Sequence, residues 1–128
     1  MSDRELLERA AKAYWDGEVD DVMSFRWSEQ DAAIAYIHGD NQDHNGEDRE
    51  RVWNPLTDDG DALRLAVRLK MSMVLESFGF KGPNTWVRAP GTERVQYHEG
   101  DPCAATRRAI VRAAAAIDAA RAEGEPTP

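Results

Sequence analysis

The sequence predicts an α+β domain in which helices pack against an antiparallel sheet. Two stretches repeat apolar residues at steps of three and four, as helices with one buried face do. A third, alanine-rich stretch begins at an Asp-Pro pair, which is a typical helix start. Between them lie short runs of β-favouring residues separated by turn signals. The resulting order, helix, strands, helix, hairpin and helix, suggests a layered α+β domain.

Size and composition indicate one domain. The 128 residues can bury roughly two-thirds of their unfolded surface, and we assign residues 1–122 to a single domain and 123–128 to a disordered tail. No run of about 18 apolar residues is present, so no membrane span is expected. The charged N-terminal segment lacks the apolar core of a signal peptide. One cysteine, Cys103, excludes an internal disulfide and fits a reducing cytoplasm.

The charge balance argues against general DNA binding. Sixteen basic and 24 acidic side chains give a net charge of −8, which repels a phosphate backbone at long range. A local phosphate site can still outweigh that field within a Debye length. The acidic surface keeps the protein soluble, or it could mimic a phosphate backbone and block a nucleic-acid-binding protein.

The N-terminal half predicts a helix followed by strands. Ser2 and Glu5 form a capping box for a first helix that ends near Gly17. Val22–Trp27 has strand-forming residues, and Ser28–His38 fits either a helix or a strand, of which we favour the strand.

The polar segment Gly39–Arg51 is predicted to be an exposed loop. Two histidines and two aspartates there could ligate a divalent metal, namely His38, Asp40, Asp43 and His44. Residues 41–46 also resemble the first half of a calcium loop, but Val52 stands where a bidentate glutamate is required. We therefore expect a solvated acidic loop without a metal or another cofactor.

Residues 53–78 predict the central helix. Asn54–Pro55 makes a turn, Thr57 or Asp58 can cap the first helical turn, and Gly79 offers a C-terminal stop. The apolar residues that share the predicted buried face are Leu63, Ala66, Val67, Met71, Val74, Leu75 and Phe78. Those predicted to face water are Arg64, Arg68, Ser72 and Glu76.

A hairpin and a last helix follow. Residues 85–88 and 94–98 flank a turn with Pro90–Gly91 at its tip. In that register Trp86, Val95 and Tyr97 share one face, and Arg88 lies opposite Glu93. Asp101–Pro102 begins the last helix, which runs to about Ala122. Its stripe of small and apolar residues comprises Ala105, Ala109, Ile110, Ala113, Ala116, Ile117 and Ala120.

Cys103 is the one candidate nucleophile, because a helix start lowers the pKa of a thiol. His98 is the nearest base in the sequence, but a lone cysteine is more often a packing residue. No nucleophile elbow, P-loop or paired zinc spacing is present. The sequence therefore does not predict an enzyme.

The start of the last helix is the candidate binding site. Arg107 and Arg108 could hold phosphate together with helix-start N–H groups, or they could simply form ion pairs on a solvated helix face. Trp53 and Trp86 could stack on a base, although tryptophan packs more often in a core.

Three blocks of the sequence resemble small phage and prophage proteins of the phage ABA-sandwich type, which are mostly uncharacterised. The blocks are DRELLERAAKA, WNPLTDDGDALRLAVRL and DPCAATRRAIVRAAAAI. The resemblance implies an antiparallel sheet sandwiched or flanked by helices and supplies no catalytic residues. The region from Val22 to Arg51 is longer than in short relatives, so a site there is not implied.

By analogy with phage sponge proteins of similar architecture, we expect a non-enzymatic anti-defence protein that sequesters a cyclic oligonucleotide or cyclic ADP-ribose signal. Arg107, Arg108 and Arg94 would hold phosphates, Trp53 or Trp86 would stack on the base, and Asn54 would read its edge. The site would lie at the boundary of a homodimer or a larger symmetric oligomer. The alternatives are an acidic inhibitor of a nucleic-acid-binding protein, resembling an anti-CRISPR or DNA mimic, and a weak enzyme that uses Cys103 and His98.

Overall fold

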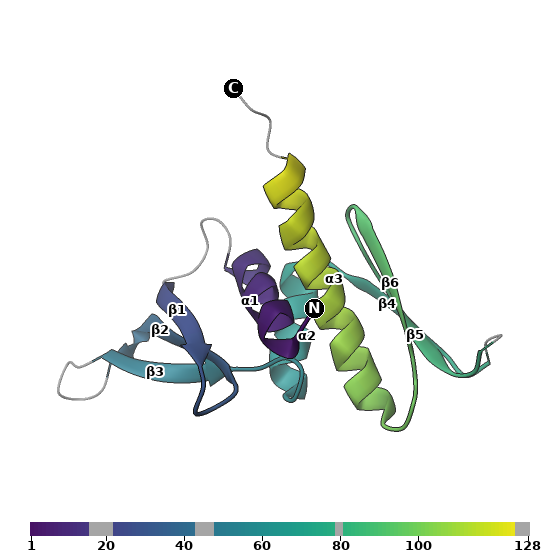
Figure 1. Cartoon of the computed structure of the whole chain (residues 1–128), viewed down its shortest axis with the longest axis horizontal. Coiled ribbons are helices and arrows are strands. Elements are labelled where there is room, and N and C mark those ends of the chain that lie inside the picture. Colours follow the sequence, from purple (N-terminus) through teal and green to yellow (C-terminus); the bar gives the residue numbers. More distant parts are fainter. Residues whose placement is uncertain (16–21, 43–47, 79–80, 125–128) are drawn as a thin grey trace.

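The computed structural model describes residues 1–15, 22–42, 48–78 and 81–124. Within these ranges, three helices and six strands follow one another (Figure 1). Their bounds are α1 Asp3–Tyr14, β1 Val22–Ser28, β2 Ala33–Gln42, β3 Asp48–Trp53, α2 Asp59–Arg68, β4 Ser72–Glu76, β5 Asn84–Ala89, β6 Thr92–Tyr97 and α3 Pro102–Gly124.

The strands form two antiparallel sheets, and the helices lie between them (Figure 1). Sheet A has the order β1-β2-β3 and sheet B has the order β4-β5-β6. Helix α1 packs on sheet A, α3 packs on α1, β5 and β6, and α2 packs on α3. The predicted α+β class with antiparallel pairing is confirmed, and each sheet is flanked by helices on one face. The sequence did not indicate that the strands divide between two sheets.

Helix α1 begins as predicted, because the Ser2 hydroxyl accepts the Glu5 N–H at 3.2 Å. It ends at Tyr14 with Trp15 as its C-cap, earlier than predicted, while Gly17 lies outside the described residues. No helix in the described part of the chain is long and apolar enough to cross a membrane.

The strand prediction for residues 22–27 is confirmed by β1, and the strand favoured within 28–38 is confirmed by β2, which begins at Ala33. The predicted loop 39–51 is wrong at both ends, because Gly39–Gln42 continue β2 and β3 begins at Asp48. Antiparallel sheets tolerate polar residues on a solvated face, and Trp53, paired with Ile34, anchors β3 in the core. Residues 43–47 lie outside the described part of the chain.

The central helix is much shorter than predicted, since α2 ends at Arg68 and residues 72–76 form β4. Lys70 adopts the left-handed conformation, with φ of 56°. Its N–H donates to the Val67 carbonyl at 3.2 Å, and the Met71 N–H donates to the Ala66 carbonyl at 2.9 Å. This pair of hydrogen bonds is a Schellman motif, which ends a helix. The predicted cap is confirmed, because the Asp58 carboxylate accepts the Asp61 N–H.

The C-terminal half follows the sequence closely. The β5–β6 hairpin turns at Pro90–Gly91 with Arg88 opposite Glu93, as predicted. Asp101 accepts the Cys103 N–H at 2.9 Å and caps α3. Helix α3 extends to Gly124, so the predicted end near Ala122 is too early, while residues 125–128 of the predicted tail lie outside the described residues.

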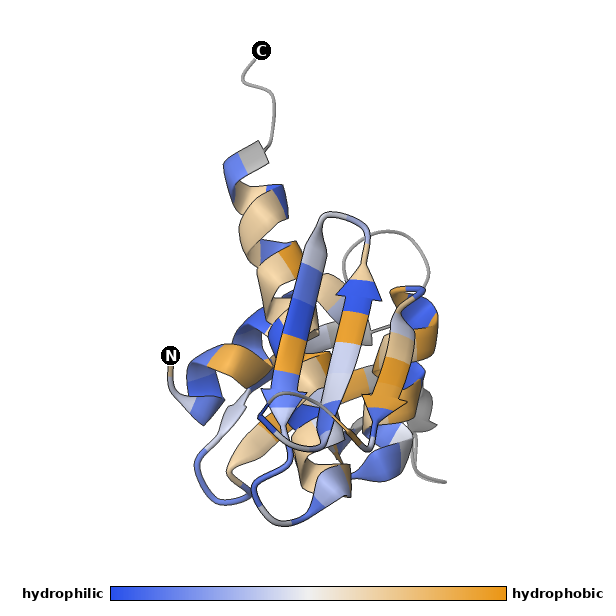
Figure 2. Ribbon diagram, turned by 90° about the vertical axis from the view of Figure 1, so that its right-hand side faces the viewer, coloured by the Kyte–Doolittle hydropathy of each residue, from blue (hydrophilic) through white to orange (hydrophobic). Residues whose placement is uncertain are grey.

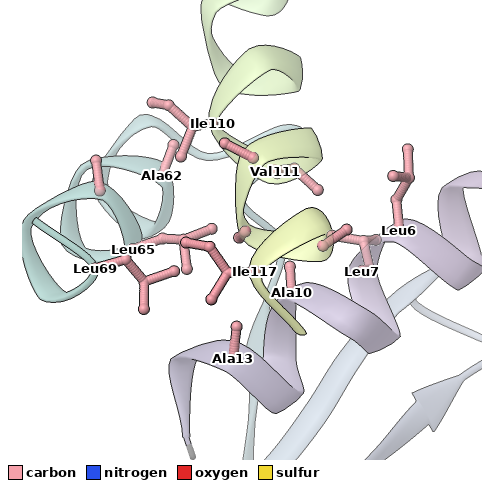
Figure 3. Packing of buried hydrophobic residues seen from close by; sticks show 14 of the residues in the cluster. Leu6, Leu7, Ala10, Ala13, Ala62, Leu65, Leu69, Ile110, Val111 and Ile117 are labelled. Carbon is pink, nitrogen blue, oxygen red and sulfur yellow. The ribbon is translucent and has the colours of Figure 1, made fainter. Parts of the chain in front are cut away.

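The main core lies where the three helices meet, as Figure 3 shows. Alanines carry the closest contacts between α1 and α3, and Ala10, Ala11, Ala109, Ala113 and Ala114 are all fully buried. Of the predicted α3 stripe, Ala116 is only half-buried and Ala120 is exposed, whereas Val111, Ala114 and Ala115 join the buried set. Small side chains let the helix axes approach, so the two helices bring sheet A and sheet B close together.

Candidate functional site

Exposed apolar side chains gather around β4, the edge strand of sheet B. We call the following residues the β4 surface: Leu63, Val67, Met73, Val74, Leu75, Phe78 and Trp86. Figure 2 shows that β4 is the most hydrophobic strand of this sheet. In the described part of the chain, only Met1 and Val52 are large exposed apolar residues outside the β4 surface. Contiguous exposed apolar area of this kind marks a contact site for a protein or a ligand.

The face of sheet B turned away from the helices, which we call the outer face, carries an apolar ladder. Val74 pairs with Trp86, and Trp86 pairs with Val95 in the next strand. Trp86 is 38% exposed. Beside this ladder, Arg88 and Glu93 form an ion pair at 3.5 Å. Together these strands border a shallow hollow of about 380 Å³.

A second hollow, of about 240 Å³, lies on the opposite side of β4. It is bordered by α2, β4 and the start of α3. Leu63, Met73, Leu75 and Ile110 give it an apolar lining. Met73 and Leu75 remain 37% and 62% exposed here, because sheet B packs on α3 mainly through β5 and β6.

Neither arginine at the start of α3 is free. Arg107 donates to the Leu56 carbonyl at 2.9 Å and to the Asp59 carboxylate at 2.6 Å, and its side chain is 16% exposed. Arg108 pairs with Asp3 at 3.0 Å. Arg107 borders the 240 Å³ hollow, with the Asp59 carboxylate beside it. An anion entering there would have to displace a carboxylate.

None of the other predicted site residues is hydrogen-bonded to these arginines in the described part of the chain. Trp53 is 2% exposed and stacks on Tyr14, with ring centroids 5.3 Å apart. Arg94 donates to the neighbouring Glu93 carbonyl. Trp86 is the predicted site residue that offers an exposed aromatic face, and it lies on the outer face of sheet B.

Asn54 holds the turn between β3 and α2. Its side-chain oxygen accepts the Leu56 N–H at 3.0 Å, and its backbone N–H donates to Asp61 at 2.9 Å. The same Asp61 carboxylate accepts a hydrogen bond from Arg64, which raises the pKa of that guanidinium. These bonds fix the entry to α2 and therefore the direction in which Leu63 and Val67 face.

Cys103 and His98 are not hydrogen-bonded to each other in the structure. Cys103 is exposed, whereas the His98 ring nitrogen Nε2 lies 2.7 Å from the Thr85 hydroxyl. Thr85 is fully buried and also contacts the Thr106 hydroxyl at 2.9 Å, so this network ties sheet B to α3. Across the described residues there is no cluster of three metal-ligating side chains, and Asp43 and His44 of the predicted histidine–aspartate cluster lie outside them.

Sequence reasoning missed the β4 surface as a site. Leu63, Val67, Val74 and Leu75 were placed in the core, because they fit one helical face. The signal that could have revealed the strand is the run Ser72–Glu76, which is short and apolar and could be either element.

Comparison with known proteins adds no family. No family model, no curated protein and no solved structure matches this chain. The resemblance to phage ABA-sandwich proteins therefore stays a prediction.

Proposed function

We propose that this chain is a non-enzymatic binding protein that regulates or inhibits another protein by direct contact, and that the outer face of sheet B makes this contact. The observation that carries the proposal is the apolar ladder Val74–Trp86–Val95, in which Val74 is 54% and Trp86 is 38% exposed. Side chains on the solvated face of an antiparallel sheet are normally polar, so an apolar ladder there supports a buried contact in the working complex. Tryptophan is also among the residues that most often dominate interface energy.

The charge of the chain supports a basic partner. Glu76 and Glu93 border the ladder, and the whole chain carries a net charge of −8. Complementary charge speeds encounter and selects partners more than it adds affinity. Nucleic-acid-binding proteins present basic surfaces of this kind, so they are the partner class we infer. If the phage resemblance holds, the partner is a host or defence protein in the bacterial cytoplasm.

The test compares three immobilised baits in a bacterial lysate: wild type, Trp86→Thr and Val52→Thr. Val52 is the matched control, because it is 49% exposed on a strand of the other sheet. We expect a basic protein to be retained by wild type and Val52→Thr and lost by Trp86→Thr. With the purified partner, Trp86→Thr should weaken binding by about 30-fold or more, as for loss of an interface hot spot. Equal binding by all three baits would contradict the proposal.

A second candidate function is sequestration of a nucleotide-derived signal. Trp86 and Arg88 border the same 380 Å³ hollow, which offers an aromatic face beside a guanidinium. In this function Arg88 would hold the phosphates, a role that the sequence analysis assigns to Arg107 and Arg108. Cyclic dinucleotides, cyclic trinucleotides and cyclic ADP-ribose should then raise the melting temperature of wild type but not of Trp86→Thr, and the ligand should be recovered intact after heating. Unchanged melting with all of these compounds excludes this candidate.

A further inference from the structure

We propose that β4 pairs with β4 of a second copy of this chain, so that two copies of sheet B join into one continuous antiparallel sheet. The surface concerned is the free edge of β4 together with its inner side chains, Met73 and Leu75. It shares Val74 with the ladder around Trp86, but strand pairing uses the backbone edge of β4, so the proposal does not depend on the function given above.

The first argument comes from comparing the four sheet edges. A free edge strand offers unpaired N–H and C=O groups, and proteins blunt such edges with charges, bulges or covering groups. Strand β3 carries the exposed charged residues Glu50 and Arg51, and β1 has an irregular register between Val22 and Ser24. The Val95 carbonyl of β6 accepts a hydrogen bond from Arg112 at 3.0 Å.

Within the described residues, strand β4 has none of these protections. Its sequence is SMVLE, with one charge at the very end, and it pairs with β5 over all five residues without irregularity. Met73 is 37% exposed and Leu75 is 62% exposed, although both face the helix side of the sheet. A flat, apolar and unprotected edge is a template for another strand.

The second argument is that β4 is complementary to itself. Paired residues must lie on the same face of a sheet, and the antiparallel register centred on Val74 pairs all five residues. It places Val74 opposite Val74 of the partner subunit and Met73 opposite the partner's Leu75. Apolar residues therefore meet apolar residues on both faces, and none of the five pairs brings like charges together.

The third argument is charge complementarity on the outer face. In this register Glu76 lies opposite the partner's Ser72, and Ser72 is paired with Arg88 within each copy. Glu76 of one copy would then face the partner's Ser72, with the partner's Arg88 on the next strand. Because serine is small, the long arginine side chain can reach across it towards Glu76. Arg88 is 72% exposed and otherwise pairs only weakly with Glu93, at 3.5 Å. Two such contacts, related by the two-fold axis, would fix the register.

The proposed β4–β4 dimer also accounts for the exposure of Leu63 and Val67. Both lie on α2 and are 58% and 69% exposed, and Leu63 borders the 240 Å³ hollow. Continuing the sheet past β4 would close the open side of the hollow with the inner side chains of the second copy. The dimer would also bring the two outer faces next to each other, so a partner protein would meet a doubled surface.

The first experiment measures mass in solution by light scattering and sedimentation. Wild type should have twice the monomer mass of 14.3 kDa. Val74→Lys places two ammonium groups opposite each other at the two-fold axis and should weaken self-association by at least about tenfold. Val52→Lys is the matched control and should stay dimeric. Val74 is 54% exposed, so an unchanged circular dichroism spectrum and a cooperative melt should show that the variant folds.

The second experiment tests the register by disulfide formation in a Cys103→Ser background. Val74→Cys should cross-link to itself, because directly opposite Cα atoms lie within disulfide range. Ser72→Cys should not, since the two copies of position 72 are four residues out of register, about 13 Å apart. Val52→Cys should also remain uncross-linked.

A monomeric wild type with no cross-link at position 74 would overturn the proposal, and so would a Val74→Lys variant that stays dimeric. These outcomes are separable from failure of the proposed function. A monomer that still binds a basic protein through Trp86 would contradict the β4–β4 dimer but not the proposed function. A β4-linked dimer that binds no protein through Trp86 would contradict the proposed function but not the dimer.

Discussion

Trp53→Ala is expected to lower the free energy of unfolding by about 3–5 kcal/mol, as for removal of a large core aromatic residue. Trp53 is 2% exposed and contacts the rings of both Tyr14 and Trp15, with centroids 5.3 and 5.1 Å away. Its loss would leave a cavity between α1 and sheet A that alanine cannot fill. Urea unfolding followed by circular dichroism measures the change.

The matched control is Trp86→Ala, the same substitution at the exposed tryptophan. It should cost about 1 kcal/mol or less, because Trp86 lies on the outer face of a sheet. If Trp53→Ala left stability unchanged and instead abolished binding of a ligand, Trp53 would be a site residue and its placement in the core would be wrong.

Leu65→Ala is expected to lower the free energy of unfolding by about 3 kcal/mol. Leu65 is fully buried at the junction of the three helices, near Leu69 and Ile117 (Figure 3). Leu63, on the same helix, is 58% exposed and points away from that junction. Leu63→Ala should therefore change stability by less than about 0.5 kcal/mol in the isolated monomer.

This pair of variants separates two orientations of α2. The helical periodicity placed Leu63 in the core, whereas the structure places Leu65 there. A larger loss for Leu63→Ala than for Leu65→Ala, measured with a variant such as Val74→Lys that keeps the protein monomeric, would show that α2 is rotated from the position described.

Elements with strong local signals were predicted from the sequence. The Ser2 cap, the Pro90–Gly91 turn and the Asp101–Pro102 start each use backbone chemistry within a few residues, and all three are confirmed. The end of α2 carried no such signal. The left-handed residue after α2 is Lys70, whereas glycine is the residue that usually marks a helix end at this position. The helical spacing of apolar residues therefore continues in the sequence through β4.

The candidate site depends on contacts between distant residues, which a single sequence does not reveal. Arg107 donates a hydrogen bond to Asp59, 48 residues away in the sequence, and Arg108 donates one to Asp3, 105 residues away. The sequence predicts both arginines to be available for phosphate, because the aspartates that pair with them are distant along the chain. Likewise, the exposure of Val74 and Leu75 follows from β4 being an edge strand, which is a property of the sheet order.

The central claim is that the chain works by protein contact through β4 and the face beside it. Hydrogen–deuterium exchange of the β4 amides, measured at several protein concentrations and with a partner retained through Trp86, tests it most directly. The account predicts that β4 amides become protected as concentration rises and that β5 and β6 gain protection on adding the partner, while the β3 edge of sheet A stays unchanged. Rapid exchange along β4 under every condition, indistinguishable from a strand edge open to water, would contradict it.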